Sequence, residues 1–406
     1  MKFSALRRFV GSYSVFRMNT IFLLKLIALL KISFAKFIRL LFFFKKSRHA
    51  CRVITDVIPC SRKKGAPFEI LITVPEETFS HPLPGNVEEI VHWKFTRMHQ
   101  LRLPPLSVLK LTNASIVGKH AYTLTEEGAL VYEASPVFAL SPRLHPVFAL
   151  PFLPASEKIA GGTAVFSQAG EDNFFHWLFD VLPKFKLLEW AGAIPDHFLI
   201  SSEKRFQKES LSLLGLHPEL IISLKDGELY QCEKAIIFTQ ALIFSRWRCL
   251  FLRELFSKWM ADDIEPGFRL YVTRKNELRR RITNEVEVES LLAGYGFVVV
   301  NPATLSLREQ INIFSQAECV VASHGGALAN IVFASDGCKL IELFSPGYVN
   351  CCFWGIASII GVTYFYLLGK GRRYGDWDPH LVYADILIEI AQLRKLLHKA
   401  GIERII

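Results

Sequence analysis

From Gly161 onward, short apolar runs alternate with segments whose apolar residues recur at helical spacing. Short apolar runs bounded by turn-forming residues are typical of buried strands, and the amphipathic segments between them are typical of helices. Strands that alternate with helices predict a parallel sheet covered on both faces. The expected strands are 163–167, 198–201, 220–224, 234–239, 269–273, 297–300, 319–322 and 339–343, and the expected helices are 173–190, 203–214, 284–293, 306–316 and 381–400.

The alternation is interrupted once, by an acidic segment at 262–267 that ends in Pro-Gly and is typical of a linker. One alternating block on each side predicts an α/β protein with two Rossmann-like halves and a cleft between them. In such sheets, ligands bind at the carboxyl ends of the strands. We therefore expect an N-terminal segment over 1–46, a first half over 47–260 and a second half over 261–406.

The N-terminal segment has a different pattern, because Leu, Ile and Phe fill residues 18–44 and single cations interrupt them. No window of about 20 residues is free of charge, so the run is a poor membrane-spanning helix. Lys25, Lys36 and Arg39 fall on one side of a helix whose remaining surface is apolar. This pattern predicts an amphipathic helix lying in a membrane interface. A core helix and a type II signal anchor are the alternatives.

The charge distribution also favours a membrane surface as a partner. Residues 1–64 hold fifteen Lys or Arg and one acidic residue, a net charge of +14, whereas the whole chain carries +10, so the remainder carries −4. A nucleic-acid groove would need basic residues on the folded body, so no nucleic-acid partner is expected. Positive charge after the apolar run disfavours transfer of the body across a membrane, which places it on the cytoplasmic face.

Polar residues in three segments carry the candidate chemistry. In the first, Asn173, His176 and Asp180 share one face of the expected helix, at spacings of three and seven residues. Asp180 or His176 could remove a proton from a substrate hydroxyl. Alternatively, Asn173 caps the helix while His176 and Asp180 pair with each other for a structural reason.

The second segment is basic. Arg274 ends an expected strand, and Arg279–Arg281 precede the helix that begins near Asn284. Guanidinium groups bind diphosphates bidentately. Cations ahead of a helix N-terminus are unfavourable unless an anion binds there. The alternative is a solvated run of charges.

The third segment is a turn at His324-Gly325-Gly326 after the expected strand 319–322. Glycine has no Cβ, so the backbone at these two positions can come close to a ligand. The helix expected to follow would favour a phosphate bound at its N-terminus. Glu342, on the strand 339–343, could hold two ribose hydroxyls. Alternatively, its carboxylate accepts hydrogen bonds from nearby backbone N–H groups.

Together the three segments resemble the glycosyltransferase 61 family over residues 161–368. The matching residues are Asn173 to Pro183, then Arg274 with Arg280 to Glu285, and last Ser323 to Asn330 with Ile341-Glu342. The family's usual His-Gly-Ala-Gly turn has its last two residues exchanged here. The arginine that usually follows Leu-Pro is Lys184.

The resemblance implies an inverting transferase of the two-Rossmann (GT-B) type. Such an enzyme moves a sugar from a UDP-sugar donor, bound by the second half, to a hydroxyl of a glycan or lipid-linked acceptor, without a metal or other cofactor. The implied base is Asp180, with His176 next, and Glu285 would orient an arginine or the donor sugar. The residues expected to bind substrate are Asn173, Arg274, Arg280, Arg281, Asn284, Glu285, His324, Gly325, Gly326, Asn330 and Glu342.

Other interpretations stay open. Asp376-Trp377-Asp378 matches the Asp-x-Asp pattern of metal-dependent transferases, but Asp at a helix start is common, so no metal site is predicted. The eight cysteines include no Cys-x-x-Cys pair, which gives no indication of zinc. A fucosyltransferase-like enzyme of similar fold, or a membrane-docked protein that binds nucleotide sugars without turnover, would share many of these features.

Overall fold

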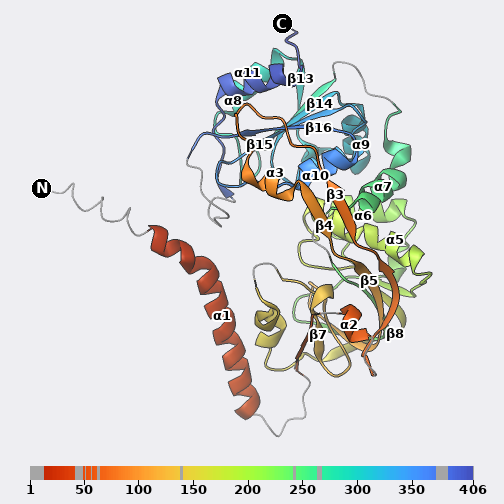
Figure 1. Cartoon of the computed structure of the whole chain (residues 1–406). Coiled ribbons are helices and arrows are strands. Elements are labelled where there is room, and N and C mark those ends of the chain that lie inside the picture. Colours follow the sequence, from red (N-terminus) through yellow and green to blue (C-terminus); the bar gives the residue numbers. More distant parts are fainter. Residues whose placement is uncertain are drawn as a thin grey trace, which may run out of the picture.

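The computed structural model describes residues 13–41, 49–50, 52–55, 57–61, 65–137, 140–240, 244–262, 268–371 and 383–405. These residues form a mixed α/β structure with a nine-stranded mixed sheet, a five-stranded parallel sheet and a two-stranded ribbon (Figure 1). The expected linker lies outside the described residues except for Asp262 at its near end.

The five-stranded sheet follows the predicted alternation of strands and helices. Its order is β13-β12-β14-β15-β16, and every neighbouring pair is parallel. The strands are β12 (Arg269–Val272), β13 (Phe297–Val300), β14 (Cys319–Ser323), β15 (Lys339–Phe344) and β16 (Thr363–Leu368). The helices are α8 (Glu285–Ala293), α9 (Leu307–Gln316), α10 (Cys352–Ile359) and α11 (Ile390–Lys399). The strands and helices predicted here are confirmed, whereas α10 and β16 were not predicted, and the last helix begins later than expected.

Alternate residues of the central strand β14 point to opposite faces, as the pleat of a strand requires. Val320 belongs to a core that includes side chains of α9 and α10, whereas Val321 belongs to a core with side chains of α8 and α11. All five residues of β14 are buried. A strand covered on both faces reads as a continuous apolar run, which is why its position could be predicted.

The nine-stranded sheet differs from the prediction. Its path is β1-β7-β6-β5-β11-β8-β9-β10, with β2 also paired to β5. The strands are β1 (Arg52–Ile54), β2 (Glu69–Val74), β5 (Leu106–Val117), β6 (Tyr122–Leu124), β7 (Ala129–Val131), β8 (Ser156–Val165), β9 (His197–Leu199), β10 (Ile221–Ile222) and β11 (Leu229–Phe238). Only β8 to β11 and the β1–β7 pair are parallel, because the long strand β5 pairs antiparallel with β11. The parallel pairing predicted for the strands after Gly161 is therefore confirmed for β8 to β11, whereas the antiparallel strands that extend the sheet beyond β11 were not predicted.

Helices of this region lie between the two sheets or beside them: α4 (Phe174–His176), α5 (Pro183–Trp190), α6 (Arg205–Leu213) and α7 (Arg246–Leu255). A π-helical turn at Trp177–Val181 joins α4 to α5, and Pro183 occupies the start of α5. The predicted break at Pro183 is confirmed. A proline is tolerated there because the first N–H groups of a helix have no partner within the helix.

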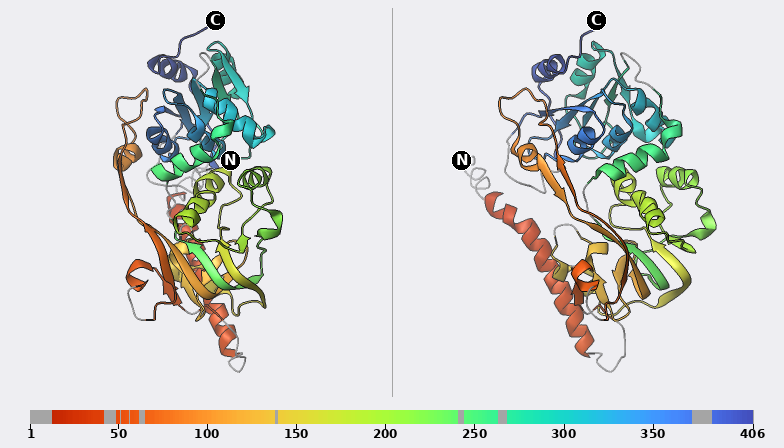
Figure 2. Two further views of the ribbon diagram at one scale, coloured as in Figure 1. Left: turned by 90° about the vertical axis from the view of Figure 1, so that its right-hand side faces the viewer. Right: turned by 45° about the vertical axis from the view of Figure 1, so that its right-hand side comes forward.

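A ribbon carries part of the first block onto the second sheet. Strands β3 (Glu77–Ser80) and β4 (Gln100–Leu103) pair antiparallel, and helix α3 (Trp93–Met98) lies in the segment between them. Both views of Figure 2 show this segment reaching the five-stranded sheet. There, the N–H of Gly85 donates to the carbonyl of Tyr364, and the fully buried ring of Phe95 lies 4.7 Å from that of Tyr366. The ribbon thus docks α3 beside the carboxyl end of β16.

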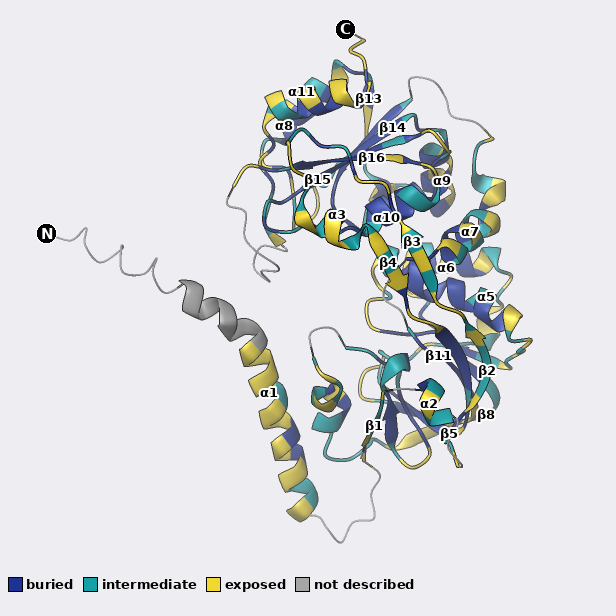
Figure 3. Ribbon diagram, viewed as in Figure 1, coloured by how far each residue is buried: buried dark blue, intermediate teal, exposed yellow. Residues whose placement is uncertain are grey.

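Helix α1 (Tyr13–Leu41) lies apart from the sheets and contacts the body near its C-terminal end (Figures 1 and 3). Ile32 and Ala35 are buried there. Arg39, expected on the polar side of the helix, donates hydrogen bonds of 2.7–3.2 Å to the carbonyls of three residues in the segment 148–151. Within the described residues, no helix is both long and apolar enough to span a bilayer.

Candidate functional site

A cavity of about 610 Å³ brings the three polar sequence segments together. From the first segment, Asn173 and His176 line it. From the second, Arg280 lines it, and the third contributes His324 and the Gly325-Gly326 turn at the end of β14. The volume is within the range of small-molecule sites.

His176 and Asp180 form a hydrogen-bonded pair at one side of this cavity. The imidazole Nδ1 lies 2.7 Å from Oδ2 of Asp180. The His176 side chain is 39% exposed, whereas that of Asp180 is only 7% exposed and does not line the cavity. With Nδ1 engaged, the imidazole can offer only Nε2 to a substrate, and the carboxylate fixes its orientation.

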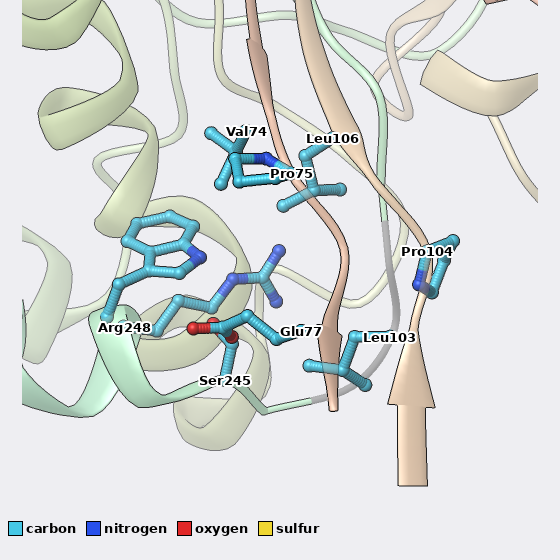
Figure 4. A pocket seen from close by; sticks show the side chains of 9 residues that line it. Val74, Pro75, Glu77, Leu103, Pro104, Leu106, Ser245 and Arg248 are labelled. Atoms are coloured by element: carbon cyan, nitrogen blue, oxygen red, sulfur yellow. The ribbon is translucent and has the colours of Figure 1, made fainter. Parts of the chain in front are cut away.

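Arg248, on α7, holds the other oxygen of Asp180. Its Nη1 lies 3.4 Å from Oδ1, and both side chains are buried. Figure 4 shows that Arg248 also lies beside Glu77 and Ser245 in a separate small cavity. Burial raises the pKa of Glu77, an effect that Arg246 and Arg248 oppose. Asp180 therefore has two partners: its Oδ1 faces the buried Arg248, and its Oδ2 faces the more exposed His176.

Two arginines lie at the glycine turn. The Arg274 side chain is 10% exposed and rests against Gly325: a Cβ on that glycine would lie 1.9 Å from Nη1. Burial lowers the pKa of Arg274, and the nearby charge of Arg280 lowers it further. The Nε atoms of both arginines are buried and have no hydrogen-bond partner within the described residues. Two adjacent cations with unused donors are suited to an anion.

Arg280 adopts a backbone conformation that favours glycine. Its φ is +56°, in the left-handed region, which costs a residue with a Cβ roughly 1–2 kcal/mol. Its guanidinium lies 5.6 Å from the ring centre of Tyr348, another lining residue. Strained residues of this kind cluster at functional sites, where the surroundings hold them in place.

His324 is held from behind by a buried network. Its Nδ1 lies 2.5 Å from Oε1 of Glu342, and the hydroxyl of Tyr364 donates to Oε2 at 2.5 Å. Glu342 is fully buried and does not line the cavity. Burial and the adjacent Glu342 both raise the pKa of Tyr364, which stays a hydrogen-bond donor. Both carboxylate oxygens are therefore occupied by the protein, and Glu342 contacts His324 without lining the cavity.

Comparison with known families decides the assignment. Residues 174–341 match the family described as Glycosyltransferase 61. This match assigns residues 174–341 to the glycosyltransferase 61 family. The matched region runs from α4 to β15 and contains His176, Arg280, His324 and the Gly325-Gly326 turn, whereas Asn173 and Tyr348 lie outside it. Among curated proteins, no match to the chain was found.

The match to the glycosyltransferase 61 family implies glycosyl transfer as the general activity. In this glycosyltransferase, Asn173 has two roles. Its Oδ1 accepts a hydrogen bond from the N–H of Phe175, which caps α4 as one interpretation of the sequence expected. It also lines the cavity and lies 3.2 Å from where a Cβ of Gly326 would be.

Four further predicted residues lie outside the cavity of the glycosyltransferase. Arg281 forms an ion pair of 2.8 Å with Asp385, and Asn284 donates to the carbonyl of Ile388, so both hold the segment that follows residue 383. Glu285 is buried and accepts hydrogen bonds from Tyr271 and Thr273. Asn330 is also buried and donates to Gln310. The helix expected after the glycine turn is a 3₁₀-helix at Gly326–Phe333.

Sequence reasoning missed two walls of the cavity. Helix α3 contributes Trp93, Lys94, Arg97 and Met98, and the segment after β15 contributes residues 348–353. No local pattern marks α3, because its place depends on the ribbon that docks it on the second sheet. The signal that the sequence did offer was Trp93 close to two cations, Lys94 and Arg97. Within the described residues, no group of three or more His, Cys, Asp or Glu is placed to hold a metal ion, and Asp376 and Asp378 lie outside those residues.

Proposed function

We propose that this glycosyltransferase is an inverting enzyme of the GT-B type that moves a sugar from a UDP-sugar to a hydroxyl of a glycan or lipid-linked acceptor. One observation carries the proposal. A single cavity combines a carboxylate-oriented histidine with an arginine and a glycine turn. The first group can accept a proton, and the second can bind a diphosphate.

The diphosphate of the donor would bind at the turn between β14 and the following 3₁₀-helix. Arg280 reaches this part of the cavity, and Arg274 lies directly behind Gly325. Glycines at 325 and 326 let phosphate oxygens approach backbone N–H groups. As the bond to the sugar breaks, negative charge grows on the leaving diphosphate, and fixed cations stabilise that charge. Because two arginines supply this positive charge, we propose transfer without a metal ion.

His176 is the base in this proposal, and Asp180 is its positioning residue. The acceptor oxygen attacks the anomeric carbon from the side opposite the diphosphate and loses its proton to Nε2 of His176. The new C–O bond forms as the bond to the diphosphate breaks, and the bonding electrons leave with the diphosphate. Asp180 stabilises the imidazolium that results, because its Oδ2 already accepts from Nδ1.

The membrane surface is the proposed partner of α1. Large apolar side chains are exposed along it, including Phe22, Leu30, Phe34 and Phe37, each between 56% and 64% exposed. The first 64 residues also carry a charge of +14. An exposed apolar helix beside clustered cations suits an anionic bilayer surface. We propose that α1 lies in the interface and holds the body at the cytoplasmic face.

Nucleotide release from UDP-, GDP- and CMP-sugars, tested against a panel of glycan acceptors, examines the proposed reaction. We expect acceptor-dependent release of UDP, a product with inverted anomeric configuration by NMR, and loss of both in His176→Ala. Release of GDP from GDP-fucose instead would favour the fucosyltransferase-like alternative. UDP binding without any turnover would favour a non-catalytic nucleotide-sugar-binding protein.

A further inference from the structure

The charged residues that line the cavity are all cationic: Lys94, Arg97 and Arg280. The donor diphosphate proposed above accounts for Arg280, which comes from the segment after β12. Lys94 and Arg97 come from α3, at the far end of the β3–β4 ribbon. The diphosphate therefore does not account for the positive charge that α3 adds to the cavity.

Helix α3 is built to present these side chains. Phe95 is fully buried between the rings of Tyr366 and Trp354, at centroid distances of 4.7 and 5.3 Å. The hydroxyl of Tyr366 also accepts a hydrogen bond of 2.8 Å from the N–H of His92. With this face of the helix fixed, the neighbouring positions 93, 94, 97 and 98 line the cavity.

Three of the exposed or half-exposed residues of α3, Trp93, Lys94 and Arg97, have complementary properties. Trp93 is 38% exposed and offers an aromatic face. Lys94 stands 5.6 Å from the Trp93 ring centre, and its Nζ donates to the carbonyl of Val349 at 3.0 Å. Arg97 is exposed and makes no hydrogen bond or ion pair within the described residues. An aromatic face beside a guanidinium suits a sugar ring that carries an anionic group.

We propose that Trp93 and Arg97 on α3 form an acceptor subsite for a sugar that bears a carboxylate or a phosphate group. The sugar ring packs on Trp93, the anionic group binds Arg97, and Lys94 adds positive charge on the same wall. This inference rests on the proposed function, because it takes the Arg280 side of the cavity as the donor site. It names a property of the acceptor, which the family assignment leaves open.

The test uses the purified full chain in detergent, first titrated with UDP and then saturated with it. Saturation-transfer NMR then measures binding of methyl β-D-glucuronide, D-glucose 6-phosphate and the neutral methyl β-D-glucoside. We expect at least one charged sugar to bind about tenfold more tightly than the neutral one, as a charge-assisted hydrogen bond would give. The tighter of the two charged sugars identifies a carboxylate or a phosphate as the ligand.

Two variants assign the effect to α3. Arg97→Ala is expected to remove the preference for the charged sugar while the Kd for UDP stays within about twofold. The control is Arg308→Ala, an exposed arginine of α9 that lines no part of the cavity, and it should change neither value. Equal binding of charged and neutral sugars, or loss of UDP affinity in Arg97→Ala, would overturn the subsite. Absence of UDP binding in the unaltered chain would instead refute the donor site.

Discussion

Gly325 and Arg274 touch so closely that no side chain fits between them. A Cβ built on Gly325 would lie 1.9 Å from Nη1 and 2.7 Å from Cζ of Arg274. The φ of Gly325 is 177°, so its backbone is extended and available to any residue. Glycine is required at this position by the contact, not by backbone conformation.

Gly325→Ala is therefore expected to displace Arg274 and to weaken UDP binding at least tenfold. Gly326→Ala is the matched control, because the nearest atoms to its Cβ all belong to the Asn173 side chain, with Oδ1 closest at 3.2 Å, and alanine is the family's usual residue at this place in the turn. We expect its Kd to change less than threefold. Calorimetric titration with UDP measures both, and equal Kd values for the two variants would contradict the account of the turn.

The pairing of His176 with Asp180 predicts that substitutions of the two residues lower kcat to different extents. His176→Ala should lower kcat by about 10²–10⁴-fold, the usual contribution of a general base, with UDP affinity unchanged. Asp180→Asn should lower kcat less, because the His176 imidazole remains. It loses the carboxylate that orients it and that offsets its positive charge after proton transfer. Single-turnover kinetics at saturating donor measure the step. A His176→Ala enzyme with normal turnover would exclude His176 as the base.

Asp180 also neutralises Arg248, which gives a stability prediction. Asp180→Asn removes the carboxylate that lies 3.4 Å from the buried Arg248 guanidinium while Glu77 remains beside it, and removal of one partner of a buried pair costs about 3–5 kcal/mol. Because the contact is 3.4 Å long, we expect the lower end of that range. The double variant Asp180→Asn with Arg248→Met should regain most of the loss in urea unfolding, yet stay catalytically impaired. A double variant no more stable than Asp180→Asn would show that the pair is not coupled.

Lys184 makes the stability depend on pH. Burial lowers its pKa to about 7, although Glu171 and Asp180 oppose the shift, and its Nζ donates to the carbonyl of Phe166 at 2.6 Å. The unfolded chain, with a lysine pKa of about 10.4, binds more protons between pH 7 and 10, so stability contributed by Lys184 rises with pH in that window and is lost as pH falls toward 7.

The free energy of unfolding of the unaltered protein, relative to that of Lys184→Met, should thus rise by up to about 1.4 kcal/mol per pH unit between pH 7 and 9.5. Comparison of urea unfolding curves at matched pH isolates this group from the other titrating residues, which both proteins share. Parallel stability profiles for the two proteins would mean that Lys184 keeps its ordinary pKa.

The exposed face of α1 predicts binding to vesicles. Phe34→Glu with Phe37→Glu should reduce flotation with vesicles of anionic lipid at least tenfold, because both the apolar contact and the attraction to the surface are weakened. Ile32 and Ala35 contact the body instead, so Ala35→Ser serves as the control and should float like the unaltered chain. Binding that is unaffected by the glutamates would argue against the proposed interface.

Four of the five strands of the second sheet could be predicted because they are short apolar runs, and three of these, β12, β14 and β15, are buried on both faces. Apolar runs such as 319–322 have few alternative placements, and the helices between them carry clear caps, as at Ser306 with Glu309. The antiparallel part of the first sheet could not be predicted, because β5 is long and is preceded by short proline-rich runs that show no β-α alternation.

The candidate site, too, could be predicted from the sequence only in part. The spacing of His176 and Asp180 allowed a pair, and the structure confirms that hydrogen bond. The partner of Glu342 could not be foreseen, since Tyr364 reaches it only through the pairing of β15 with β16. Likewise, α3 lies more than 200 residues before the strands against which it packs. Only the β3–β4 ribbon brings Arg97 to the cavity.

Calorimetric titration of the full chain with UDP, with and without EDTA, tests the central claim most directly when Arg280→Ala is measured beside it. Arg281→Ala is the control, since that neighbouring side chain pairs with Asp385 outside the cavity. We predict micromolar binding that EDTA does not change, loss of at least tenfold in Arg280→Ala, and little change in Arg281→Ala. Absence of UDP binding by the folded chain, or equal losses in both variants, would contradict the placement of the donor diphosphate at this cavity.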